Sequence, residues 1–144
     1  MPSITFHVLS DTAPDAHLRH ACRLAEQAVD AGRRVFVWTA SSSETKRLDD
    51  LLWTFGEHSF LPHEVALPGH VPSHERVCIL LGEQEPSPGA GDVLINFSVS
   101  APSNPDVFTQ VTEIVVADEE RKRLSRERFK FYRDRGLQPQ KQDI

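Results

Sequence analysis

The amino-terminal part of the chain alternates between two patterns of apolar residues. Residues 4–9 carry apolar side chains at alternate positions, which is the period of a strand. Between residues 14 and 31 apolar side chains recur at helical spacing, and Gly32 follows where a helix would be capped. Residues 34–39 form a continuous β-rich run, typical of a strand covered on both faces in a parallel sheet. The order strand, helix, strand predicts a right-handed crossover.

A second helix and an irregular connection follow. Ser41 and Glu44 have the spacing of a capping box, and the apolar residues after them predict a helix that continues through Trp53. Residues 55–75 contain several prolines and glycines but no sustained apolar period. We interpret this segment as an irregular, partly packed connection.

Three further apolar runs have the length of strands. They lie at residues 77–81, 93–97 and 113–116. Residues 82–91, between the first two runs, are rich in proline and glycine and predict a mobile loop.

The last helix is the most clearly marked element. Residues 118–135 begin with acidic side chains, end with basic ones and precede Gly136. Together these alternating elements predict one α/β domain over residues 1–137, with a mainly parallel sheet between helices in three layers. We expect the polar residues 138–144 to form a frayed tail.

Length and charge restrict the possible functions. The chain has 144 residues, of which 39% are hydrophobic and 26% charged, as expected for one globular domain. Lys and Arg number 16 and Asp and Glu 21, so the net charge is −5. This balance offers no overall attraction to the DNA phosphate backbone, and we expect little or no direct nucleic-acid binding. Any basic site must be local.

No targeting or cross-linking pattern is present in the sequence. The first residues have the strand period rather than the basic start and apolar run of a secretion signal. No apolar stretch approaches the roughly 20 residues of a membrane-spanning helix. The two cysteines, Cys22 and Cys78, are far apart and form no CxxC pair, so neither a disulfide framework nor a zinc site is predicted. We interpret the chain as a cytoplasmic protein that does not contact membranes.

The places where cofactors usually bind lack the necessary residues. Residues 10–14, in the first strand-to-helix turn, contain no glycine and no P-loop lysine, which argues against nucleotide binding. His17, His20 and Cys22 are close in sequence, but Cys22 points away from His20 around the helix and no motif supplies a fourth ligand. We therefore predict neither a cofactor nor a metal site.

A small α/β enzyme is one alternative function. His58 and His63 bracket Ser59, but a nucleophilic serine needs a base and an oriented acid, and no GxSxG elbow is present. Such an enzyme would have a deep polar pocket at these residues. Because nothing local favours that arrangement, we predict no catalytic residues.

The last helix concentrates positive charge in an acidic protein. Residues 118–135 hold eight Lys or Arg against five acids. One stripe recurs at steps of three or four residues: Lys122, Arg126, Phe129 or Lys130, and Arg133. The stripe could be a solvated face with ion pairs, or a groove in which basic groups bind the carboxylates of an acidic peptide beside the apolar wall of Phe129. A third reading is direct nucleic-acid binding, which would depend steeply on salt.

Large apolar side chains gather around the irregular connection. Residues 51–55 and 60–63 contain Trp53 and Phe60. These aromatic groups could close the core beneath a loop. If they are exposed, they form the kind of patch that anchors a protein partner.

Five segments together resemble a known family. In order and spacing they resemble the chi subunits of bacterial DNA polymerase III clamp-loader assemblies, and the resemblance covers nearly the whole chain. The segments are ITFHVL (residues 4–9), AGRRV (31–35), RLDDLLW (47–53), SFLPH (59–63) and RERFKFYR (126–133).

The resemblance implies a Rossmann-like accessory protein in the bacterial replisome at the nucleoid, without an active site of its own. Chi proteins pair with a small partner, psi, which tethers them to the clamp loader. They also bind the acidic C-terminal tail of the single-stranded-DNA-binding protein. Four residues match the family's tail-binding helix, and Arg133 continues their stripe; the four are Lys122, Arg126, Phe129 and Lys130.

The same resemblance places a second site in the aromatic connection. Phe60 matches the aromatic position of the psi-binding surface, with Trp53, Pro62 and His63 beside it. Without psi in the source organism, this surface could serve another partner, such as a helicase. The chain departs from the family pattern at Phe129, where the best-known members have tyrosine, so a phenolic hydrogen bond would be lost while the apolar wall remains.

Overall fold

The structure is a computed structural model that describes residues 2–54, 63–65, 78–86 and 91–144. Seven strands form one sheet in the order β3-β4-β2-β5-β6-β1-β7, and every pair of neighbouring strands is parallel. The elements are β1 (Ser3–Val8), α1 (Ala16–Asp30), β2 (Val35–Trp38), α2 (Ser42–Thr54), β3 (His63–Val65), β4 (Ile79–Gly82), β5 (Val93–Asn96), a 3-10 turn (Pro105–Val107), β6 (Gln110–Val115), α3 (Glu119–Asp134) and β7 (Gln140–Asp143).

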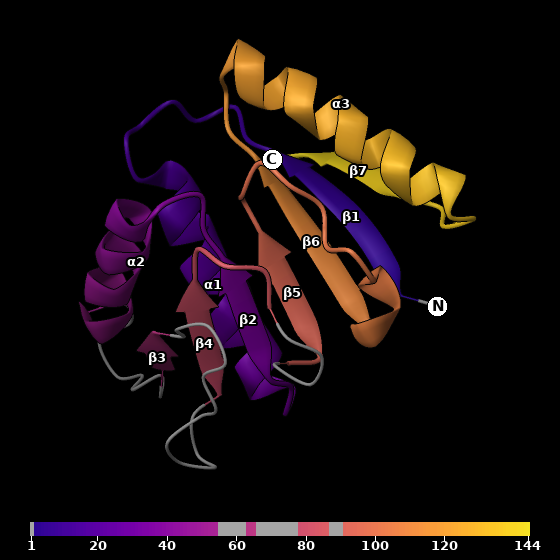
Figure 1. Ribbon diagram of the computed structural model, residues 1–144. Helices are drawn as coiled ribbons and strands as arrows, with labels where there is room; N and C mark the ends of the chain where they lie inside the picture. Colours follow the sequence, from indigo (N-terminus) through magenta and orange to yellow (C-terminus); the bar gives the residue numbers. More distant parts are fainter. Residues whose placement is uncertain (1, 55–62, 66–77, 87–90) are drawn as a thin grey trace.

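Helices cover both faces of the sheet, which confirms the predicted three-layer α/β fold. Helices α1 and α2 lie side by side on one face, and α3 lies on the opposite face (Figure 1). Successive residues of β5 show the two cores that result. Ile95 packs toward α1 and α2, whereas Leu94 packs toward α3 with Phe6 and Tyr132. Every residue of the central strands β2, β4 and β5 is buried, because both faces of these strands are covered.

Local signals in the sequence define the helix ends. Ser41 Oγ accepts a hydrogen bond from the Glu44 amide at 3.2 Å, and the Glu44 carboxylate accepts one from the Ala40 amide at 2.9 Å. The predicted capping box is thus confirmed, with its return bond displaced by one residue. Asp118 caps α3 by accepting from the Arg121 amide at 2.9 Å. Gly136 follows α3 with φ of 83°, a conformation that glycine adopts without strain.

The two edge strands differ from the prediction. Residues 63–65, inside the expected irregular connection, form β3 and pair with β4. The prediction of a frayed tail at residues 138–144 is wrong, because residues 140–143 form β7 and pair with Thr5 to Val8 of β1. The Ile144 amide extends the ladder by donating to the Val8 carbonyl at 2.9 Å.

The reason for the wrong prediction lies in the side chains of β7. All of them are polar and exposed, so the strand carries no alternating apolar signal. Backbone pairing with the free edge of β1 forms the strand instead, while buried Leu137 and Pro139 fix the chain that leads into it. The sheet therefore continues beyond the expected domain end at residue 137.

Candidate functional site

A buried polar network fixes α3 on the sheet. Glu113 of β6 is fully buried, and its carboxylate accepts a hydrogen bond from Arg128 Nε at 2.9 Å. Tyr132 Oη donates to the same carboxylate at 2.5 Å, and Asn96 Nδ2 donates at 3.0 Å. Burial raises the pKa of Glu113, while the Arg128 cation and these donors oppose the shift. Because three elements meet at one carboxylate, the network sets the rotation of α3 about its axis.

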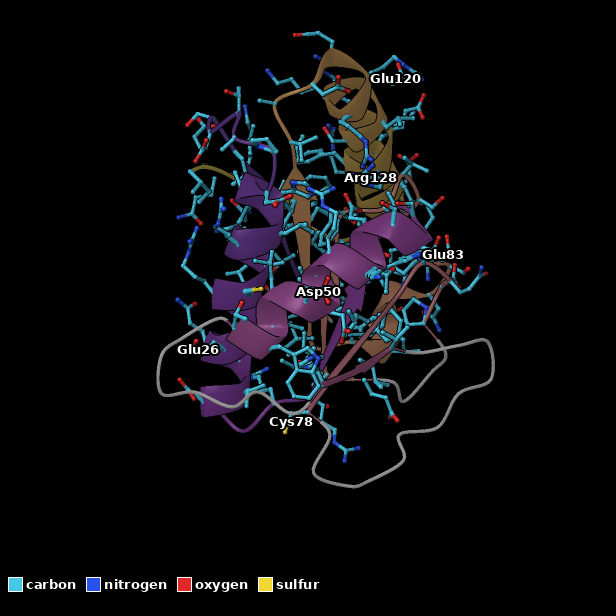
Figure 2. The ribbon with its side chains drawn as sticks, turned by 90° about the vertical axis from the view of Figure 1, so that its left-hand side faces the viewer. Glu26, Asp50, Cys78, Glu83, Glu120 and Arg128 are labelled. Carbon is cyan, nitrogen blue, oxygen red and sulfur yellow. The ribbon has the colours of Figure 1, made fainter. Side chains whose placement is uncertain are left out.

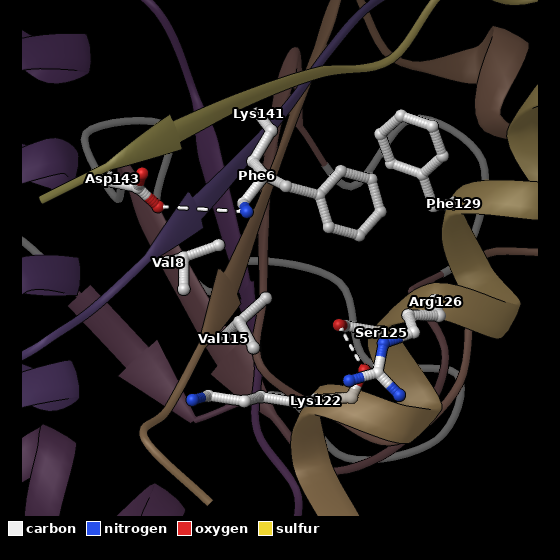
Figure 3. A pocket seen from close by; sticks show the side chains of 9 residues that line it. All are labelled: Phe6, Val8, Val115, Lys122, Ser125, Arg126, Phe129, Lys141 and Asp143. Atoms are coloured by element: carbon white, nitrogen blue, oxygen red, sulfur yellow. Dashed lines mark hydrogen bonds and ion pairs between the residues drawn. The ribbon is translucent and has the colours of Figure 1, made fainter. Parts of the chain in front are cut away.

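Beside this network, α3 forms a pocket with the strands beneath it. The cavity has a volume of about 370 Å³ (Figure 3). It is lined by Phe6 and Val8 of β1, Val115 of β6, Lys122, Ser125, Arg126 and Phe129 of α3, and Lys141 and Asp143 of β7. Phe129 packs on Phe6 with 5.3 Å between ring centroids. The pocket therefore combines apolar side chains from the sheet with basic side chains at its margin.

The structure brings together three of the five residues predicted for tail binding. Lys122, Arg126 and Phe129 all line this pocket. Lys130 and Arg133 are exposed on the same helix but do not line it. They extend the basic stripe toward the C-terminal end of α3.

Sequence reasoning missed the strand side of this pocket. Phe6 and Val8 belong to a predicted strand face, but the sequence did not say that α3 covers that face. Lys141 and Asp143 were missed because their segment was expected to be frayed. The alternation of β1 was an available signal for Phe6 and Val8; no periodic pattern marked Lys141.

The basic residues of α3 fall into two groups. Those of the first group are paired with acids: Arg123 with Glu120 and Glu127, Arg128 with Glu113, and Arg135 with Asp106. Arg121 has no ion pair within the described residues, but its guanidinium donates to the Phe97 carbonyl. Those of the second group have no ion pair with any residue that the structure describes and lie along one stripe: Lys122, Arg126, Lys130 and Arg133. This second group is the predicted binding stripe. Its charges are therefore available to an external anion, whereas those of the first group already have carboxylate partners.

The second predicted site is only partly described. Phe60 and Pro62 lie outside the described residues. Trp53, at the end of α2, is 59% exposed, and its ring lies 4.8 Å from that of His63. The side chain of His63 is buried, with Nε2 at 3.0 Å from Asp49 Oδ1. The structure thus brings Trp53 and His63 together, with Trp53 presented to solvent and His63 beneath it.

The histidines and the cysteine of α1 do not converge on one point. His17 Nε2 lies 2.9 Å from Glu44 Oε2, while His20 Nε2 lies 2.8 Å from His7 Nδ1. Burial, with smaller contributions from the neighbouring His7 and Arg23, lowers the pKa of His20 to about 4. Burial also raises the pKa of the Cys22 thiol to about 12, which keeps it protonated and unreactive.

No group of three or more metal-ligating side chains occurs within the described ranges. Of the three residues of the catalytic alternative, His58 and Ser59 lie outside those ranges and only His63 lies within them.

A smaller cavity of about 250 Å³ lies where nucleotides bind in many open α/β sheets, beyond the carboxyl ends of β1 and β6. Its polar side chains already serve the fold. Glu44 accepts from the Ala40 amide and contacts His17, and Arg121 Nη1 donates to the Phe97 carbonyl at 2.9 Å. The turn that follows β1 contains no glycine.

None of the helices in the described part of the chain combines the length and apolar character needed to cross a membrane.

Comparisons with known proteins agree with this architecture. The family model of the DNA polymerase III chi subunit, HolC, matches residues 1–140. A protein from Pseudomonas aeruginosa named DNA polymerase III subunit chi is 34% identical over 136 residues, which cover 94% of this chain and 92% of the relative. The protein of the same name from Escherichia coli K12 is 31% identical over 141 residues, covering 95% of both chains.

A solved structure shares the fold alone. It is a DEAD box protein from the hyperthermophile Methanococcus jannaschii, with a TM-score of 0.53 and 13% identity. The match covers 99% of this chain but only 42% of that one. Family model and relatives together confirm the resemblance seen in the sequence, and the chain belongs to the DNA polymerase III chi subunit family.

Proposed function

We propose that this chi-family chain is a non-catalytic accessory subunit that links the clamp loader, through psi, to the acidic C-terminal tail of the single-stranded-DNA-binding protein. One observation carries the proposal: an apolar pocket bordered by Lys122 and Arg126, basic residues that have no ion pair with any described residue. A tail of acidic residues that ends in an apolar side chain has the complementary chemistry.

The pocket and the stripe would act on different parts of such a tail. Phe6, Val8 and Val115 offer apolar contact to a terminal side chain. Lys122 and Arg126 stand at the margin of the same cavity, where carboxylates of the peptide would lie. Lys130 and Arg133, farther along α3, are placed for acidic residues upstream of the terminus.

A nucleic-acid ligand is less well supported by the same residues. Phe129 is packed against Phe6 at the pocket, so its ring is not an open platform on which bases could stack. The net charge of −5 opposes a polyanion that extends beyond the stripe. A short acidic peptide needs only the local cluster of positive charge.

The exposure of Trp53 supports the proposal that this chain binds psi. An aromatic side chain of this size, 59% exposed on a helix end, is suited to anchor an apolar partner surface. In an organism that lacks psi, the same surface would bind another protein, such as a helicase.

A titration tests the tail-binding proposal directly. A fluorescent peptide that copies the acidic tail of the cognate single-stranded-DNA-binding protein is titrated by anisotropy, beside a bare single-stranded oligonucleotide. Arg126→Ala should weaken peptide binding by on the order of 1 to 3 kcal/mol, because a charge-assisted contact is lost. Arg123→Ala is the matched control, since Arg123 lies on the same helix but is paired with Glu120 and Glu127.

The two ligands separate the hypotheses. Peptide binding that Arg126→Ala weakens and Arg123→Ala spares, with no oligonucleotide signal, supports the accessory role. Equal effects of both variants would mean that only general charge matters. Oligonucleotide binding that weakens steeply with salt would favour direct nucleic-acid recognition instead.

A further inference from the structure

The last strand supplies one wall of the pocket. Lys141 and Asp143 of β7 both line the cavity, and their alternate positions along the strand place them on the same face of the sheet. Figure 3 shows Lys141 extending from β7 over the pocket, while Lys122 and Arg126 approach it from α3. The cavity therefore has basic side chains on two opposing sides.

Lys141 differs from Lys122 and Arg126, the α3 cations that line the cavity, because it has an acid beside it. Its Nζ lies 4.0 Å from Asp143 Oδ1, and the two side chains are 63% and 83% exposed. An ion pair at this distance and exposure contributes little to stability and exchanges readily for another partner. The Asp143 carboxylate thus occupies the position that an anionic ligand would need beside Lys141.

The short distance between a terminal side chain and its own α-carboxylate indicates which ligand group would contact Lys141. A terminal residue that places its side chain against Val8 and Val115 keeps its α-carboxylate only a few bonds away, at the margin of the same cavity. The cations that line the cavity are the ones within reach of that group. Lys130 and Arg133 do not line it and are left for upstream acids.

We propose that Lys141 is a further specificity-determining residue, which binds the terminal α-carboxylate of an acidic peptide, and that Asp143 is the internal competitor that this carboxylate displaces. The proposal rests on the tail-binding function proposed above. It makes β7 a part of the binding site, in which the Lys141–Asp143 pair opens and Lys141 turns to the ligand.

Two probes that differ in one charge test this assignment. One is a peptide with a run of aspartates followed by phenylalanine with a free carboxylate; the other is the same peptide with a C-terminal amide. Lys141→Ala should weaken binding of the free-acid peptide by about three- to tenfold but change amide binding less than about twofold. Asp143→Asn should tighten the free-acid complex by about two- to threefold, because the competing charge is removed.

Matched controls come from α2, on the opposite face of the sheet. Lys46→Ala and Asp50→Asn change the same charges at exposed positions there, as Figure 2 shows for Asp50. Both controls should leave the affinity for either peptide unchanged. Any shift in the controls measures the effect of net charge alone, and is subtracted.

The outcomes separate this inference from the function on which it rests. If Arg126→Ala weakens free-acid binding but Lys141→Ala and Asp143→Asn behave like their controls, the role of Lys141 is overturned while tail binding stands. Equal losses with both peptides in Lys141→Ala would also overturn it, since Lys141 would then bind an upstream acid. If the unmodified protein binds neither peptide, both the function and this inference fail.

Discussion

At the β7 edge of the sheet, the candidate site is a cavity with a defined lining of apolar and basic side chains. At the β3 edge, the candidate site is an exposed aromatic side chain, Trp53, with His63 beneath it and the half-exposed Val65 of β3 nearby on the same edge. The first site suits a charged peptide end, and the second suits an apolar protein surface. The two edges to which we assign the two proposed partners thus differ in chemistry and lie at opposite ends of the sheet (Figure 1).

The two edges also differ in the contacts that hold their elements in place. Helix α3 is tied to the sheet by the buried Glu113 network, whereas Trp53 is largely exposed and packs on the buried ring of His63. Breaking the network should therefore affect the β7 edge more than the β3 edge.

The largest expected effect is on stability. Arg128→Met leaves the Glu113 carboxylate buried without its cation, which should lower the free energy of unfolding by about 3 to 5 kcal/mol at neutral pH. Urea unfolding measures the loss, and Arg123→Met, at an exposed position of α3, should change it by less than about 0.5 kcal/mol. A loss below 1 kcal/mol in Arg128→Met would show that the network does not hold α3.

The same variant should change how stability depends on pH. Burial raises the pKa of Glu113 in the folded state above its unfolded value, so its contribution is present at low pH and is lost as the pH rises through the folded pKa. The Arg128 cation lowers that pKa. Without it, the free energy of unfolding should decline more steeply as the pH rises above about 4.5, by up to about 1.4 kcal/mol per pH unit. The free energy of unfolding is measured for both proteins from about pH 5 to about pH 7. If it changes with pH by the same amount in the variant and in the unmodified protein, this assignment is contradicted.

The next largest effect is expected on partner binding at the β3 edge. Trp53→Ala should weaken binding of the psi partner by about 2 to 4 kcal/mol, since a large exposed aromatic anchor is removed, and should leave tail-peptide binding unchanged. Calorimetry with each partner measures both affinities. Val99→Ala removes another exposed apolar side chain and serves as the control. Loss of both activities in Trp53→Ala would mean that the two edges are coupled.

A smaller effect is expected at Phe129. Phe129→Ala should weaken tail-peptide binding by about 1 to 2 kcal/mol, because the pocket loses an apolar wall packed on Phe6. Phe129→Tyr keeps that wall, restores the residue of the best-known family members, and should change the affinity by less than about 0.5 kcal/mol, or improve it. A loss as large in the tyrosine variant as in the alanine variant would exclude an apolar role for this position.

The last expected effect comes from salt; it is comparable in size to that of Phe129→Ala, and it distinguishes the two edges. Raising the ionic strength from about 0.05 M to about 0.5 M should weaken tail-peptide binding by about tenfold, and psi binding by less than about twofold. The reason is that exposed charges dominate one site and apolar contact the other. Equal salt sensitivity of both complexes would show that the two sites do not differ in this way.

Much of the fold could be predicted because its signals are local. The capping box of Ser41 and Glu44 begins α2, and the charge gradient from Asp118 to Arg133 marks α3. The stripe of Lys122, Arg126 and Phe129 was likewise visible, since helical spacing fixes which residues share a face. By contrast, β7 had no apolar period to reveal it.

The sequence by itself determined the alternation of strands and helices, the membership of the family and the basic face of α3. Only the tertiary structure decided which of the basic residues are paired and which can meet a ligand, because Glu113, 15 residues before Arg128 in the chain, becomes its partner only when α3 packs on β6. The tertiary structure also decided that Lys141 stands opposite Arg126. That placement depends on the free edge of β1, whose unpaired backbone groups order a polar segment that could not form a strand alone.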